Sequence, residues 1–62
     1  MRFMRLPEVM ERVGLRRSTL YLYIAEGRFP RQVKLGKRCV AWNSDDIDNW
    51  MKQKLAPSKQ LR

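Results

Sequence analysis

Glycines and prolines divide this chain into short segments, and that division limits what it can fold into. Pro7 is placed to begin a helix, because the amide hydrogen that proline lacks has no partner in a first helical turn. Val9 and Val13 follow at helical spacing, and Gly14 is a natural left-handed stop. The pattern predicts a first helix over residues 7–13.

A second helix is predicted to begin after the Gly14-Leu15-Arg16 turn and to end at Gly27. Two short helices joined by a three-residue turn containing glycine form a helix-turn-helix. Ser18 or Thr19 could cap this helix, but Arg16 stands at the position where a capping side chain is expected, so the sequence leaves the helix start open by a couple of residues. The inward-facing residues of this helix recur at i, i+3 and i+4: Leu20, Tyr23 and Ile24.

Two extended segments, residues 31–35 and 38–42, flank Gly36-Lys37, which suits a type II′ hairpin turn with glycine first. In that register Val33 faces Val40, and Leu35 and Trp42 share their side, so that one face is apolar. The loop end of this hairpin, which we interpret as a wing, collects three cations: Lys34, Lys37 and Arg38.

A third helix is expected from Ser44, its N-cap, with Asp45 and Asp46 in the first turn, where negative charge is favoured. Ile47, Trp50, Met51 and Leu55 follow at helical spacing. We therefore expect a small α+β winged helix-turn-helix over residues 1–56, followed by a disordered basic tail over 57–62. One core cluster is predicted to join all the elements: Val9, Leu20, Ile24, Val40, Trp42 and Trp50.

The composition argues against metal sites and catalysis. With no histidine and a single cysteine, Cys39, the chain has neither a disulfide nor the ligands of a structural zinc site, which fits a reducing cytoplasm. Asp45, Asp46 and Asp48 do not suggest a metal site, because neighbouring helical carboxylates point in different directions. No nucleophile has an evident base beside it, and no segment is apolar enough to span a membrane. We expect no enzymatic activity and no cofactor.

Charge narrows the choice of partner. Fourteen Lys and Arg against six Asp and Glu give a net charge of +8, which favours DNA, RNA or an anionic membrane surface. A merely soluble basic protein is the alternative. The exposed face of the second helix is expected to carry Arg17, Ser18, Tyr21, Leu22 and Ala25, and arginine can read guanine through two hydrogen bonds. Helix, wing and charge together favour DNA over a merely solvated surface.

Several motifs resemble those of the AlpA-type phage transcriptional regulators, over residues 4–55. They are Leu6-Pro7-Glu8-Val9, Gly14-Leu15, Ser18-Thr19-Leu20-Tyr21, Glu26-Gly27-Arg28-Phe29-Pro30, Val33-Lys34-Leu35-Gly36 and Trp42. The resemblance implies a MerR-like winged helix-turn-helix that activates integrase or excision genes of a mobile element, related to excisionases. It implies DNA contacts by Arg17, Ser18, Thr19 and Tyr21 in the helix and by Lys34, Gly36 and Arg38 in the wing. Arg16 in place of a serine cap and Leu22 in place of a basic residue depart from the pattern.

The sequence thus predicts a double-stranded-DNA-binding regulator of a prophage or mobile element. Two alternatives remain open: an excisionase-like architectural factor, and a module that docks on an integrase or regulator. We expect a monomer in solution, and an integrase or a second copy in tandem on DNA stays open as a further partner. The candidate DNA-binding residues are Arg16, Arg17, Ser18, Thr19, Tyr21, Leu22, Arg28, Lys34, Gly36, Lys37 and Arg38.

Overall fold

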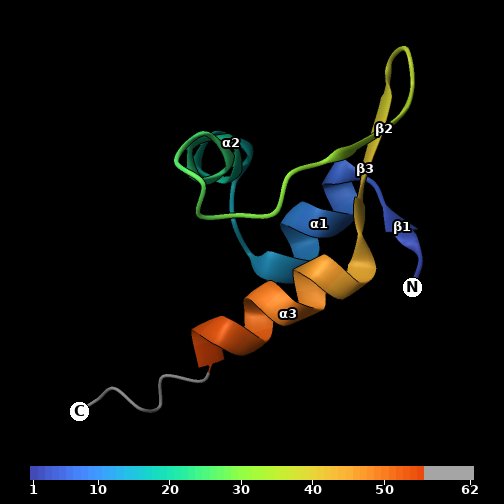
Figure 1. Ribbon diagram of the computed structural model, residues 1–62. Coiled ribbons are helices and arrows are strands. Elements are labelled where there is room, and N and C mark those ends of the chain that lie inside the picture. Colours follow the sequence, from blue (N-terminus) through green and yellow to red (C-terminus); the bar gives the residue numbers. More distant parts are fainter. Residues whose placement is uncertain (56–62) are drawn as a thin grey trace.

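The computed structural model describes residues 1–55, which form three helices and a small sheet (Figure 1). The small α+β class and the three predicted helices are confirmed. The tail predicted over 57–62, and with it the predicted domain end at residue 56, lies outside the described residues. In order, the elements are β1 (Phe3–Met4), α1 (Leu6–Val13), α2 (Arg17–Ala25), β2 (Val33–Gly36), β3 (Cys39–Asn43) and α3 (Ser44–Leu55).

The helix-turn-helix has the predicted three-residue turn. Gly14 ends α1 with a φ of 73°, and its N–H donates to the carbonyl of Met10 at 2.9 Å. Arg16 is the N-cap of α2 and its side chain makes no capping hydrogen bond, so the helix begins at Arg17 and neither Ser18 nor Thr19 caps it. Helix α2 instead starts without side-chain capping, which leaves its first amides open to an outside acceptor.

The C-terminal end of α2 is closed by a Schellman motif. Gly27, at a φ of 75°, donates to the carbonyl of Ile24 at 3.1 Å, and the N–H of Arg28 donates to Tyr23 at 2.8 Å. This left-handed exit turns the chain back beneath α2 toward the hairpin (Figure 1).

The sheet contains a strand that the sequence did not predict. Its order is β1-β3-β2, and both pairings are antiparallel. Phe3 pairs with Asn43 and Met4 with Trp42. Since cross-strand partners share a face, Met4 lies beside Trp42 in the interior, and both are fully buried.

The hairpin is present, but the predicted register is wrong by one residue. Val33 pairs with Ala41 instead of Val40, and Lys34 pairs with Val40. Gly36 belongs to β2 and pairs with Cys39, after an irregularity between Lys34 and Gly36.

The turn is formed by Lys37 and Arg38, and Gly36 is not among the glycines with positive φ, so the predicted type II′ turn is also wrong. Val33 and Leu35 stay 39% and 45% exposed, so little apolar burial was available to hold the predicted register. The fixed point of β3 is Trp42, whose Nε1 donates to the carbonyl of Pro30 at 3.0 Å.

The core lies where α1, α2, α3 and the sheet meet. Of the predicted cluster, Val9, Leu20 and Trp42 are buried together, and Ile24 and Trp50 pack against them. Val40 is half-buried and lies outside that cluster. Three buried members were not predicted: Met4, Phe29 and Ile47.

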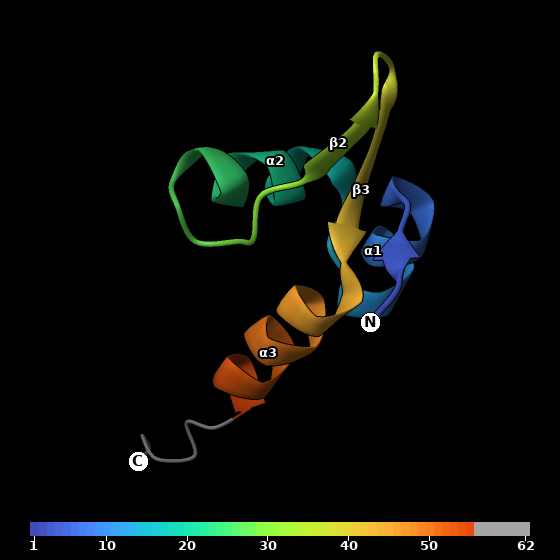
Figure 2. The same ribbon diagram turned by 45° about the vertical axis from the view of Figure 1, so that its right-hand side comes forward.

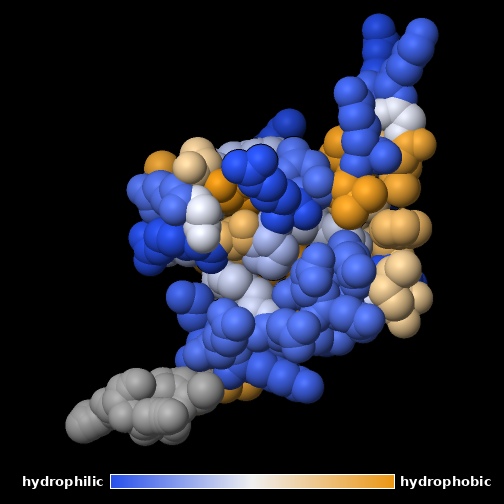
Figure 3. Space-filling view, viewed as in Figure 1, coloured by the Kyte–Doolittle hydropathy of each residue, from blue (hydrophilic) through white to orange (hydrophobic). Residues whose placement is uncertain are grey.

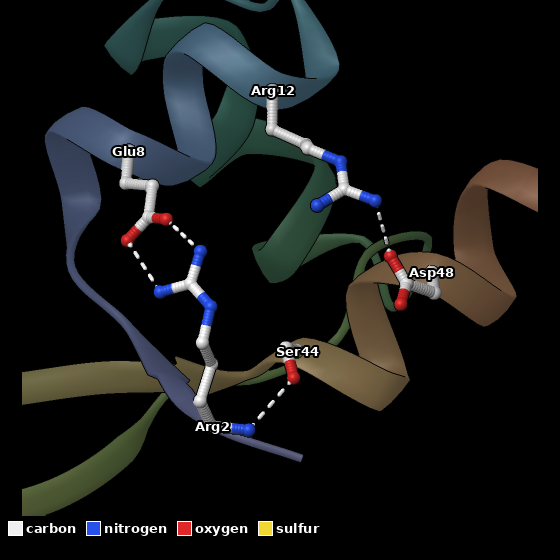
Figure 4. A network of polar contacts seen from close by, with 5 residues as sticks. All are labelled: Arg2, Glu8, Arg12, Ser44 and Asp48. Atoms are coloured by element: carbon white, nitrogen blue, oxygen red, sulfur yellow. Dashed lines mark hydrogen bonds and ion pairs between the residues drawn. The ribbon is translucent and has the colours of Figure 1, made fainter.

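The start of α3 is tied to the N-terminal strand (Figure 4). The Oδ1 of Asn43 accepts from the N–H of Asp45 at 2.8 Å, so Asn43 caps the helix and the cap predicted at Ser44 is wrong. The Oγ of Ser44 instead accepts from the backbone N–H of Arg2 at 2.8 Å, and the N–H of Ser44 donates back to the Arg2 carbonyl at 2.9 Å. The serine hydroxyl thus continues the β1–β3 ladder by one hydrogen bond and does not cap α3.

Two exposed ion pairs reinforce the same region (Figure 4). Arg2 forms a two-bonded pair with Glu8 of α1, and Arg12 pairs with Asp48 of α3 at 2.7 Å. The hydrogen bonds from Arg2 lower the pKa of Glu8, and the same bonds raise the pKa of Arg2. These contacts link α1 to the residue before β1 and to α3, away from the hairpin tip.

Candidate nucleic-acid interface

Helix α2 and the tip of the hairpin lie at the same end of the molecule, whereas α3 extends from the other end (Figures 1 and 2). In the second view α2 runs across this end toward the base of β2, and the hairpin tip projects beyond the body. The fold therefore presents one helix face and one protruding loop together, as a winged helix-turn-helix requires.

The outward face of α2 is defined by the burial of Leu20. At about 100° per residue, Ser18 and Leu22 lie about 160° from Leu20 around the helix, on either side of the point opposite it. Both side chains are exposed, Leu22 by 53%. Ser18 and Leu22 therefore lie at the centre of the outward face, together with the exposed Ala25.

The other candidate residues of α2 flank this centre. The half-buried Tyr21 and Thr19 lie about 100° from Leu20, at the two edges of this face. Arg17 lies only about 60° from Leu20, so its expected place on the outward face is wrong, although its side chain is exposed in the first turn. The exposed Arg16 precedes the helix in an extended conformation, at φ −80° and ψ 164°. All six α2 candidates thus keep some solvent exposure around the N-terminal half and the outward face of the helix.

The N-terminus of α2 carries positive charge where the helix dipole is already positive. Arg16 and Arg17 stand there, and the first turn contains no acidic residue. This placement disfavours the isolated helix by a few tenths of a kcal/mol, whereas an anion bound at this end would interact favourably with the open amides, the dipole and both guanidinium groups.

The four wing candidates lie together at the tip. Lys34, Gly36, Lys37 and Arg38 are all exposed, and hydrophilic side chains cover the tip in the space-filling view, with hydrophobic ones below it along the strands (Figure 3). The glycine adds no side chain between the cations.

Carboxylates are kept away from both of these surfaces. Within residues 1–55 the ion pairs are Arg2–Glu8, Arg12–Asp48 and Arg28–Glu26, so none of the cations of the wing or of the α2 N-terminus is paired there. The sequence between Glu26 and Asp45 contains no acidic residue. The helix-and-wing end therefore carries uncompensated positive charge.

Arg28 is the candidate that the structure sets apart. It follows α2 at the C-terminal end, pairs with Glu26 at 3.1 Å, and lies over the ring of Tyr23 at 4.6 Å from its centroid. It lines an open groove of about 710 Å³ between the α2–β2 connection and α3, together with Arg31, Trp50 and Lys54.

Sequence reasoning missed this groove, although the spacing of Arg28 and Arg31 around Phe29-Pro30 was visible. Trp50 is half-buried in it, donates its Nε1–H to the carbonyl of Arg28 at 2.8 Å and meets the ring of Phe29 edge-on at 4.9 Å. The groove is a polar surface built on an aromatic wall.

Two further observations concern residues 1–55. They contain no group of three or more Cys, Asp or Glu side chains placed to hold a metal ion. None of their helices combines the length and the apolar character needed to cross a membrane.

Comparison with known proteins identifies relatives over nearly the whole chain. An uncharacterized protein, ORF88, of Enterobacteria phage P4 is 48% identical over 59 residues, which are 95% of this chain and 67% of the relative. The DNA-binding transcriptional activator AlpA of Escherichia coli K12 is 32% identical over an alignment of 59 residues, and the match covers 86% of this chain and 84% of that protein. The family model described as prophage CP4-57 regulatory protein (AlpA) matches residues 2–55. The chain therefore belongs to the AlpA family of prophage regulatory proteins.

Proposed function

We propose that the protein is a sequence-specific double-stranded-DNA-binding transcriptional regulator of a prophage or mobile element. Helix α2 enters the major groove, and the wing contacts the backbone or the adjacent minor groove. The observation that carries the proposal is the pairing of two carboxylate-free cationic surfaces, the α2 N-terminus and the wing tip, at one end of the molecule. The name of the Escherichia coli relative, a DNA-binding transcriptional activator, supports it.

The α2 N-terminus is suited to a phosphate. The first amides of the helix have no side-chain cap, and Arg16 and Arg17 stand beside them, so a phosphodiester would satisfy the amides and neutralise the charge in one contact. A phosphate held there fixes the depth of α2 in the groove, where the side chain of Arg17 can reach a guanine edge.

The wing is suited to contacts that do not depend on sequence. Lys37 and Arg38 form the turn itself, and Lys34 lies on the strand before it, so three exposed cations lie at the tip of the hairpin. Cations at such a tip release counterions from any duplex and steepen the salt dependence of binding.

The test compares two variants on two duplexes. A binding site is first selected from random duplexes, and affinity is then measured between 50 and 200 mM salt on that site and on a scrambled one. Arg17→Ala should lose about 1–3 kcal/mol on the selected site and much less on the scrambled one. Lys37→Ala/Arg38→Ala should weaken both equally and shallow the log–log salt slope by about 2.

The matched control is Lys52→Ala/Lys54→Ala, which removes two cations from α3 at the other end of the molecule. It should change both affinities less than the wing variant does. Equal effects of the two double variants would mean that net charge alone drives binding. An unchanged preference for the selected site in Arg17→Ala would remove α2 from base reading.

A second candidate function is favoured by the groove beside α3. Arg28, Arg31 and Lys54 rim it around Trp50, with Asp46 as its one carboxylate within residues 1–55, so it suits an acidic segment of an integrase or regulator. Arg31→Glu should weaken binding to a purified integrase of the same element and leave DNA affinity within the range of the control variant. Loss of DNA binding alone would exclude this function.

The same DNA surface would also serve an excisionase-like architectural factor. Such a factor bends its site, so a circular-permutation assay with the selected duplex separates the two outputs. A position-dependent mobility favours the architectural role, and a uniform mobility favours regulation by occupancy.

A further inference from the structure

Of the three residues at the centre of the outward face of α2, only Ser18 has a hydrogen-bonding side chain. Leu22 is 53% exposed there, one turn after Ser18, and the exposed Ala25 follows on the same side. Hydrophobic atoms reach the surface over α2 in the space-filling view (Figure 3). A large apolar side chain facing water on this face gains free energy only when something apolar covers it.

The composition of α2 restricts what the helix can read. Its nine residues, Arg17–Ala25, contain one charged side chain, Arg17, and no Asn, Gln, Asp or Glu. Amide side chains are the usual bidentate partners of adenine, and carboxylates accept from the amino group of cytosine. Neither is available, so arginine for guanine and apolar contact with the thymine methyl group are the strongest specific contacts left.

We infer that α2 reads thymine through its C5-methyl group, with Leu22 as the specificity-determining residue. The inference rests on the proposed DNA-binding function and adds to it the kind of base pair at the centre of the site. Leu22 lies nearly opposite the buried Leu20, so it points deepest into a groove that α2 enters, and the small Ala25 lets the helix approach closely beyond it.

The alternative occupant of Leu22 is another protein, which is the use that a docking module would make of it. The sequence next to Leu22 disfavours that occupant, since Arg16 and Arg17 have no acidic partner within residues 1–55 and would be desolvated beside it. Against a DNA groove the same two arginines meet the phosphate backbone and, through Arg17, a guanine edge, so one ligand accounts for both the charge and the apolar centre.

The experiment removes single methyl groups from the DNA. In the duplex selected for binding, each thymine is replaced in turn by deoxyuridine, which pairs identically and lacks only the C5-methyl group. For the wild-type chain, one or two positions should weaken binding about three- to tenfold, the effect of uncovering one or two buried methyl groups. Leu22→Ala should bind the thymine duplex more weakly by a similar factor and be insensitive to deoxyuridine at those positions.

Leu55→Ala is the matched control, because Leu55 is 77% exposed on α3, and it should keep the full deoxyuridine effect. Circular dichroism melts of each variant check that folding is unchanged. Three results would overturn the inference: wild-type binding that is indifferent to every deoxyuridine, a deoxyuridine effect that persists undiminished in Leu22→Ala, or a change in association state caused by Leu22→Ala. If the selected and scrambled duplexes bind equally, the proposed function itself fails, which is a distinguishable outcome.

Discussion

The two tryptophans provide a matched pair for testing what holds the helix-and-wing end in place. Both indole Nε1–H groups donate to backbone carbonyls of the same connection, Trp42 to Pro30 at 3.0 Å and Trp50 to Arg28 at 2.8 Å. They differ in burial, since Trp42 is fully buried and Trp50 only half-buried. Replacing each by phenylalanine removes the same donor from two different environments.

The expected losses follow from that difference. In Trp42→Phe the part-buried Pro30 carbonyl loses its donor, at about 1–2 kcal/mol, and the missing part of the buried ring leaves a cavity worth about 1–2 kcal/mol more. In Trp50→Phe water can reach the Arg28 carbonyl, so we expect about 1 kcal/mol in total. A chain of this size has a free energy of unfolding of about 3–9 kcal/mol, so Trp42→Phe should leave it only marginally folded.

Thermal melts followed by far-ultraviolet circular dichroism measure the effect. The loss should lower Tm by about 10–25 °C in Trp42→Phe and by about 5 °C in Trp50→Phe. Each variant keeps one tryptophan, whose fluorescence reports the same transition at the other site. If Trp50→Phe melts as low as Trp42→Phe, burial is not the deciding term, and the contact between α3 and the α2–β2 connection is the stronger constraint.

Three further predictions concern local structure. Asn43→Ala should lower stability by about 1 kcal/mol in urea unfolding, because it removes the cap of α3, and an unchanged midpoint would contradict that role. Gly14→Ala should cost about 1–2 kcal/mol from its φ of 73° alone, whereas Gly36→Ala, with only an ordinary contact to the Cys39 Cβ at 3.8 Å, should be nearly neutral. Because Arg2 lowers the pKa of Glu8, the pair stabilises the fold above the ordinary pKa of a glutamate and loses that effect as pH falls through the lowered value, so Glu8→Gln should flatten this part of the acid-unfolding curve.

The helices could be predicted because the residues that end them lie within or next to each helix. Gly14 and Gly27 adopt the left-handed conformations that end α1 and α2, and no distant contact is needed to recognise them. The three-residue turn between the two helices then follows from the end of α1 at Gly14 and the start of α2 at Arg17. What failed were features that depend on residues far along the chain.

The hairpin register and the α3 cap are the clearest of these failures. Pairing Val33 with Val40 maximised local apolar contact, but Trp42 is fixed by Met4 and Pro30, and this constraint shifts the pairing by one residue. Ser44 has a capping side chain, yet its hydroxyl serves the backbone of Arg2, which leaves the cap to Asn43.

The solvent exposure of the candidate DNA-binding residues on α2 could be predicted, since it follows from the helical period once Leu20 is placed in the core. The arrangement of these residues around the helix could not be predicted. Which residue stands at the centre of the α2 face depends on the angle at which the helix packs, and the structure gives that place to Leu22 and Ser18 ahead of Arg17.

The pairing of the N-terminal strand with the start of α3 has a consequence for synthesis on the ribosome. Arg2 is made before its partner Ser44, which lies 42 positions later in the chain. Strand β1 therefore has no neighbour to join until the hairpin and the first turn of α3 have left the exit tunnel. Closing so large a loop is slow relative to forming α1 and α2, so these helices should form and pack together before the sheet does.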